Sequence, residues 1–172
     1  MNIRDTLLAE HSKAQSERIA DYIGDSRERF AELTASFLSE DKELSRRAAW
    51  ALSHCIDRHP ALIKPHLEAL IRNLRKDVHV AVKRNTVRVL QEVDIPERLL
   101  GEIADICFGY LADHQETVAV KVFAMSVLAN ICRREPDLGN ELRLLIEDQL
   151  PYASAGFRSR AKRVLKELAK RK

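Results

Sequence analysis

Trp50, the only tryptophan of the chain, stands among basic residues at helical spacing. In a helix it would share a face with Arg46, Arg47 and His54, which lie three or four residues away. An exposed tryptophan among arginines is typical of a protein-binding hot spot, or of a platform on which nucleotide bases stack. The alternative is that the indole packs against the N-terminal segment or a neighbouring helix.

The run His54, Cys55 and His59 invites a metal-site interpretation, but helical geometry argues against it. Cys55 lies on the predicted core face, and the two histidines, five residues apart, do not share a helical face. The sequence also has no Gly-rich phosphate loop, no G-x-S-x-G elbow and no H-E-x-x-H motif. We therefore predict no catalytic residue, no metal, no cofactor and no enzymatic activity.

The stretch that carries Trp50 belongs to a pattern that occurs four times. Its first copy places Leu44, Ala48, Ala51, Leu52 and Cys55 on one helical face. The later copies are centred on leucines that follow Leu52 at intervals of 38, 38 and 37 residues, namely Leu90, Leu128 and Leu165. A period of this length indicates a helical solenoid, in which each unit buries its apolar face against its neighbours.

Residues that start or end helices divide this solenoid into helix pairs. Residues 1–24 are expected to form an N-terminal capping helix that ends at Gly24. Four pairs follow within a single domain over residues 1–172, at about 26–58, 60–93, 96–132 and 137–170. Three prolines mark helix entrances, namely Pro60, Pro96 and Pro136. Three aspartates mark the inner turns, namely Asp41, Asp77 and Asp113. Thr117 and Ser154 are expected to be N-caps. Pro65 should kink or restart its helix.

Composition agrees with an all-α class. The chain is 45% hydrophobic yet has only five glycines and five prolines, which leaves little room for hairpins. No apolar run approaches the roughly 18 residues of a membrane span, and the polar N-terminus does not resemble a secretory signal. Three cysteines without a CxxC motif fit buried thiols in a reducing compartment, so we expect a cytoplasmic protein.

Charge is distributed unevenly along the chain. The formal net charge is +3, but residues 154–172 hold eight Lys or Arg and one acid, so this segment carries +7 and the remainder −4. Two explanations of this excess positive charge are open. One is a solvent-exposed helix face whose cations interact favourably with the helix C-terminus. The other is a patch that binds an acidic partner.

The repeats resemble the HEAT-repeat family. The shared features are the entry proline, the aspartate of the inner turn, and a second helix that reads Arg46-Arg47-Ala48-Ala49-Trp50-Ala51-Leu52. The family often pairs the turn aspartate with an arginine six residues later, which Asp41 and Arg47 match and Asp77 and Lys83 approach. The third repeat departs from this pattern, with Ala119 at that spacing, and the fourth has no turn aspartate. The resemblance implies a right-handed α-α superhelix.

The resemblance also implies that the second helix of each pair lines a concave surface. Residues one step from the buried face would then form a basic groove, made of Arg46, Trp50, Lys83, Arg84, Arg88, Lys121, Arg158, Lys162 and Arg163. We expect a non-catalytic interaction module that binds an acidic peptide or protein there. The alternative is a nucleic-acid-binding protein of the HEAT-like DNA glycosylase type, because those enzymes also carry Trp-Ala-Leu on a concave helix.

Overall fold

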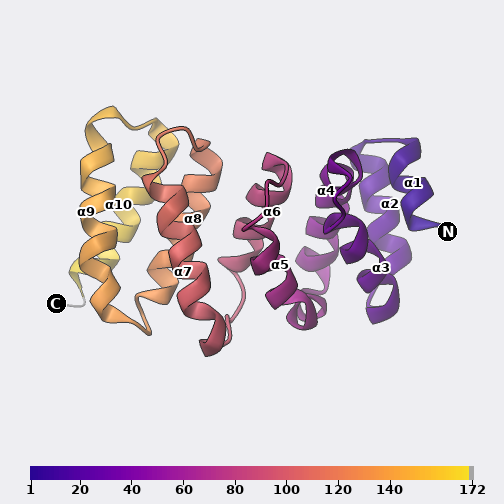
Figure 1. The fold of residues 1–172 in the computed structure, drawn as a ribbon, viewed down its shortest axis with the longest axis horizontal. Coiled ribbons are helices and arrows are strands. Elements are labelled where there is room, and N and C mark those ends of the chain that lie inside the picture. Colours follow the sequence, from indigo (N-terminus) through magenta and orange to yellow (C-terminus); the bar gives the residue numbers. More distant parts are fainter. Residues whose placement is uncertain (171–172) are drawn as a thin grey trace. The chain divides into compact units, whose positions relative to one another are not determined.

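The computed structural model describes residues 1–170. Over these residues the chain forms α-helices and short 3-10 helices and no strand, which confirms the predicted all-α class (Figure 1). It falls into two compact units, Met1–Val89 and Leu90–Lys172, and each has its own buried core. Within the described residues, no helix combines the length and the apolar character needed to cross a bilayer.

The first unit contains the N-terminal helices and the first two predicted pairs. Its elements are α1 (Ile3–Ala9), α2 (Lys13–Ile23), α3 (Arg27–Phe37), α4 (Lys42–Arg58), the 3-10 helix η1 (Pro60–His66), α5 (Leu67–Asn73) and α6 (Val80–Leu90). Helix α4 packs against α1, α2, α3 and η1. It is therefore the central element of this unit, and it carries Trp50.

The N-terminal cap differs from the predicted single helix over residues 1–24. The chain forms two helices there, because Glu10 is extended and Ser12 begins a new helix by accepting a hydrogen bond from the N–H of Gln15 at 3.1 Å. Gly24 ends the second of them with φ of 54°, as predicted for a helix C-terminus. The break leaves His11 in the α1–α2 loop, next to α4.

The predicted turn chemistry is confirmed at most positions. The Oδ1 atom of Asp41 accepts hydrogen bonds from the N–H groups of Glu43 and Leu44 at 3.0 and 3.1 Å and so caps α4. Pro60 occupies the first position of η1, and Pro65 keeps this segment in 3-10 form until α5 starts at Leu67. The pair boundaries therefore follow local signals in the sequence.

The second unit contains the third and fourth predicted pairs. Its elements are α7 (Glu97–Ala112), α8 (Val118–Ile131), η2 (Pro136–Leu138), α9 (Gly139–Gln149), η3 (Leu150–Tyr152) and α10 (Ala155–Ala169). Thr117 caps α8 and Ser154 caps α10, as predicted. Helix α8 packs against α7, α9 and α10, and its face carrying Val120, Ala124 and Leu128 is fully buried.

Candidate interaction surface

Trp50 lies on α4 and is partly exposed. The exposed fraction of Trp50 is 38%, and two imidazoles flank its indole. His11, from the α1–α2 loop, meets the ring edge-on with centroids 5.8 Å apart, and His54, one turn later on α4, stacks at 6.3 Å and 21°. Both sequence interpretations therefore hold in part: the indole packs against the N-terminal segment and still presents a face to solvent.

A shallow depression of about 410 Å³ opens beside the indole. Helix α4 forms one side, and the start of α6 forms the other. The two helices are tied by a hydrogen bond from Ser53 Oγ to Asn85 Oδ1 at 2.6 Å. The lining residues are His11, Arg46, Ala49, Trp50, His79, Val80, Ala81, Arg84 and Asn85. The depression thus combines an aromatic wall, apolar floor atoms and two guanidinium groups.

The two guanidinium groups of the depression are not equivalent. Arg46 donates from Nε and Nη2 to the carboxylate of Glu43, at 2.9 and 2.7 Å. Arg84, on α6, is exposed and makes no ion pair within residues 1–170. An anion entering the depression would therefore meet a guanidinium without an acidic partner at Arg84, and at Arg46 a guanidinium that shares the single negative charge of Glu43 with Arg47.

Glu43 holds a second arginine as well. Hydrogen bonds from Arg46 and Arg47 lower the pKa of the Glu43 carboxyl to about 2. Arg47 also donates to the backbone carbonyl groups of Leu7 and Leu8, at 3.2 and 3.0 Å, so it fastens α4 to α1. The family pattern led us to associate Arg47 with Asp41, but the structure pairs Arg47 with Glu43 one turn away.

The position of His11 in this cluster favours its neutral form. Burial lowers its pKa below the ordinary value, and the positive charges of Arg46 and Arg47 lower it further, while Glu43 acts in the opposite direction. The neutral form of this imidazole is therefore favoured beside the indole.

Other predicted groove cations of the first unit are compensated. Arg88 donates from Nη2 to Oδ1 of Asp57 at 3.1 Å. Lys83 lies near Asp77, whose pKa is lowered first by a hydrogen bond from Lys42 and to a smaller extent by the charge of Lys83. The predicted basic stripe is thus reduced in this unit to Arg84.

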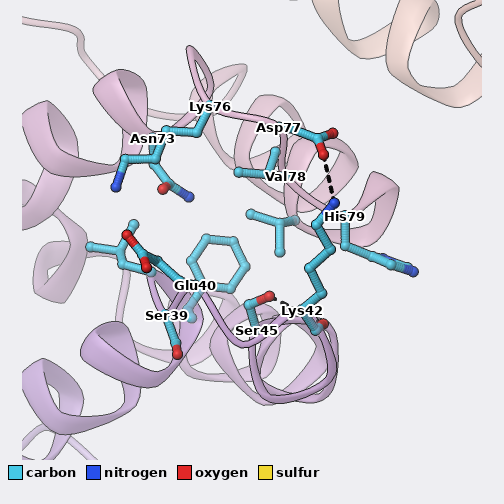
Figure 2. A pocket seen from close by; sticks show the side chains of 12 residues that line it. Ser39, Glu40, Lys42, Ser45, Asn73, Lys76, Asp77, Val78 and His79 are labelled. Atoms are coloured by element: carbon cyan, nitrogen blue, oxygen red, sulfur yellow. Dashed lines mark hydrogen bonds and ion pairs between the residues drawn. The ribbon is translucent and has the colours of Figure 1, made fainter.

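Figure 2 shows a second, smaller pocket of the first unit, where the α3–α4 turn meets the α5–α6 loop. Its volume is about 210 Å³, and the ammonium of Lys42 reaches the carboxylate of Asp77 across its mouth at 2.6 Å. The bond joins the inner turns of consecutive repeats. This pocket therefore reflects the stacking of turns, and the charges of Lys42 and Asp77 in it are matched to each other.

In the second unit, the expectation of an exposed ammonium is wrong for Lys121. Only 8% of this residue is accessible, and its Nζ donates to Oε1 of Gln149 at 2.9 Å. The amide nitrogen of Gln149 in turn donates to the carbonyl groups of Leu111 and Leu145, at 2.8 and 3.2 Å. Lys121 therefore links α8 to α9 instead of facing a partner.

The remaining predicted cations, Arg158, Lys162 and Arg163, lie on α10 and are exposed. Sequence reasoning missed the neighbouring Arg160, which is half-buried against α8 and donates to Ser126 Oγ and to Gln91 Oε1, the latter at 3.3 Å. Burial lowers its pKa from the ordinary value, with a further contribution from Arg163. The sequence signal was present, because Arg160 is four residues from the core residue Val164.

A sequence model of the HEAT repeat domain matches residues 3–168. The chain belongs to the HEAT-repeat family. No curated protein and no solved structure matches it. Membership of the family agrees with the helix pairs, entry prolines and capped turns described above, and HEAT repeats are typically non-catalytic scaffolds for protein interactions.

The thiols of this HEAT-repeat chain are placed for packing. Cys55, Cys107 and Cys132 are buried. Burial raises the pKa of Cys55 to about 12 and raises that of Cys107 as well, which keeps both thiols protonated and unreactive. Among residues 1–170, no three His, Cys, Asp or Glu side chains lie together in a way that would hold a metal ion.

Proposed function

We propose that this HEAT-repeat protein is a non-catalytic interaction module, and that its first unit binds an acidic peptide or protein segment in the depression beside Trp50. The proposal rests on one observation: a partly exposed indole and a guanidinium without an acidic partner lie in the same depression. Trp50 on α4 and Arg84 on α6 line the same depression, and among the groove cations predicted for this unit Arg84 makes no ion pair within the described residues.

The depression has the chemistry of a hot spot. Binding energy at protein interfaces concentrates in a few Trp, Tyr and Arg residues that become desolvated in a pocket. Trp50 is already held by His11 and His54, so little rotamer freedom remains to be lost when a ligand covers it. The exposed Val80, 44% accessible, extends the apolar area on the α6 side.

The charges around the depression favour a carboxylate over a second cation. Arg84 supplies a donor pair for a carboxylate, and hydrogen bonds to Glu43 hold the guanidinium of Arg46 in place. The ligand that fits is an acidic segment with an apolar or planar side chain. Its side chain would cover the indole, and an adjacent Asp or Glu would reach Arg84.

The proposal can be tested with a random peptide library displayed on phage and selected against the whole protein. Because Trp50 is the only tryptophan, its fluorescence reports directly on occupation of the depression by a selected peptide. We expect enrichment of Asp and Glu next to apolar residues, a fluorescence change on titration, and an affinity that falls as salt rises.

Two variants and two controls make the test specific. Arg84→Gln and Trp50→Ala should each lower the affinity for a selected peptide that carries a fluorescent label by about tenfold or more, as expected for hot-spot residues. Arg27→Gln removes an exposed arginine elsewhere in the unit, and Tyr152→Ala removes a 92% exposed aromatic side chain; neither should change binding. Selected peptides without acidic residues, or binding that both site variants leave intact, would refute the proposal.

A further inference from the structure

Helix α10 presents to solvent a face whose only charged residues are basic. Eight residues point away from its buried side, and all are exposed. Five are cations, three are small, and none is acidic or large and apolar. We call them the α10 ridge: Ala155, Arg158, Ser159, Lys162, Arg163, Lys166, Ala169 and Lys170.

The cations of the α10 ridge make few polar contacts within the described residues. Arg158 makes one long hydrogen bond, to the carbonyl of Pro151 at 3.4 Å. In the part of the chain that the structure describes, no ion pair is found for any of the five cations. The single acid of the helix, Glu167, lies outside the ridge and is held by Arg133 at 2.7 Å.

The ridge cations differ in this respect from three other arginines of the second unit. Other arginines of the same unit are paired: Arg133 with Glu167, Arg134 with Asp94 at 3.7 Å, and Arg143 with Glu147 at 2.6 Å. Along the ridge, by contrast, Arg158, Lys162, Lys166 and Lys170 follow one another at intervals of four residues. Like charges at that spacing repel each other and destabilise a helix.

We propose that the α10 ridge binds the phosphate backbone of nucleic acid without regard to base sequence. Arg158 and Lys166 are eight residues apart, so the ridge cations between them span roughly 12 Å of helix. Duplex DNA carries roughly seven phosphate charges in that length. Alanine and serine between the cations allow a backbone to approach closely, and phosphate contacts need no other side chain.

Two other classes of partner fit the ridge less well. A protein interface is expected to have aromatic or apolar anchors at its centre, and the ridge has none. Insertion into a membrane needs a free apolar helix face, but Phe157, Ala161 and Val164 of α10 are buried in the core of its own unit. The inference does not depend on the function proposed for the Trp50 depression, because the ridge shares no residue with it.

The test is an anisotropy titration of labelled 20-base-pair duplexes of unrelated sequences with the full chain, from about 25 to 200 mM salt. If about four phosphates are contacted, the affinity should fall roughly 100-fold between 50 and 200 mM salt, equally for all sequences. The ridge variant is the triple substitution Arg158→Gln, Lys162→Gln and Lys166→Gln. It should lower the affinity at low salt at least tenfold and flatten the dependence of affinity on salt.

A matched control separates the ridge from net charge. Arg18→Gln, Arg27→Gln and Lys64→Gln together remove three exposed cations of the first unit, and this control should bind duplex DNA like the wild type. Circular dichroism would confirm that both triple variants fold. Trp50→Ala should leave duplex binding unchanged, which distinguishes this site from the depression.

Three outcomes would overturn the inference. The first is absence of duplex binding at 25 mM salt. The second is an equal loss in the ridge variant and the control variant, because binding would then follow net charge alone. The third is that poly-glutamate, or vesicles of phosphatidylcholine and phosphatidylserine, bind the ridge more tightly than the duplex does, which would assign it to an acidic protein or to a lipid surface.

Discussion

Arg88 of α6 and Asp57 of α4, 31 residues apart in the chain, form an ion pair with 3.1 Å between Nη2 and Oδ1. The pair shows how stacking of helix pairs removes charge from a surface that is basic in sequence. The same happens within α4, where Glu43 holds Arg46. What remains available to a partner in this unit is therefore centred on Trp50 and Arg84.

Neutralising Arg84 and neutralising Arg88 should have opposite consequences. Arg88→Gln breaks a partly exposed ion pair and should lower the free energy of unfolding by about 0.2–1 kcal/mol, while peptide binding changes little. Arg84→Gln should leave the free energy of unfolding unchanged and weaken the binding of an acidic peptide. Urea denaturation and peptide titration of both variants provide the comparison. A destabilised Arg84→Gln would mean that this arginine is structural.

The Glu43 cluster should make stability depend on pH in acid. The pKa of Glu43 is about 2 in the folded protein and about 4.3 in an unfolded chain, so the ionised form is favoured by folding. Its contribution is complete above about pH 4.5 and is lost as the pH falls towards about 2. The difference in unfolding free energy between wild type and Glu43→Gln should therefore be largest near pH 7 and shrink below about pH 4.

Two measurements check the Glu43 prediction. Urea denaturation at about pH 7 and pH 3 gives the change in that difference, with Glu40→Gln in the preceding turn as a matched control that should show no such dependence. NMR titration of the Glu43 carboxyl gives its pKa directly. A midpoint near 4.3 would show that the two arginines do not hold the carboxylate in solution.

Core packing in α8 should be sensitive to truncation at the repeated leucine. Leu128 is fully buried, so Leu128→Ala should lower the free energy of unfolding by about 2–5 kcal/mol. Leu144, which is 51% exposed on α9, is the matched control, and Leu144→Ala should have little effect. Thermal or urea unfolding measures both; equal effects would contradict the assignment of faces.

The bond between Lys121 and Gln149 predicts an asymmetry between its two partners. Gln149→Leu leaves the buried ammonium of Lys121 without its acceptor, at an expected loss of about 1–3 kcal/mol in unfolding free energy. Lys121→Met removes the charge and keeps the volume, and should be tolerated better. Urea denaturation of the two variants measures both losses in unfolding free energy. A larger loss in Lys121→Met than in Gln149→Leu would show that the ammonium itself is required.

Local signals made much of the fold predictable. Helix caps such as Asp41, Thr117 and Ser154 act on backbone groups two or three residues away, so the sequence alone locates these helix starts. The same holds for the prolines at pair entrances and for the buried leucines, since helical periodicity needs no tertiary information. The prediction of a single N-terminal helix is wrong because Ser12 caps a second helix there, which is also a local signal.

The sequence by itself determined the all-α class, the capped helix starts and the buried leucines, and it named Trp50 and Arg84 as candidates. The tertiary structure decided which cations are available. Lys121 meets Gln149 28 residues later, and Arg88 meets Asp57 31 residues earlier. Such pairings depend on how one helix is placed against the next, and a shift of one helical turn would exchange the partners. Periodicity specifies which face of a helix is buried, but the register between packed helices sets which charges are neutralised.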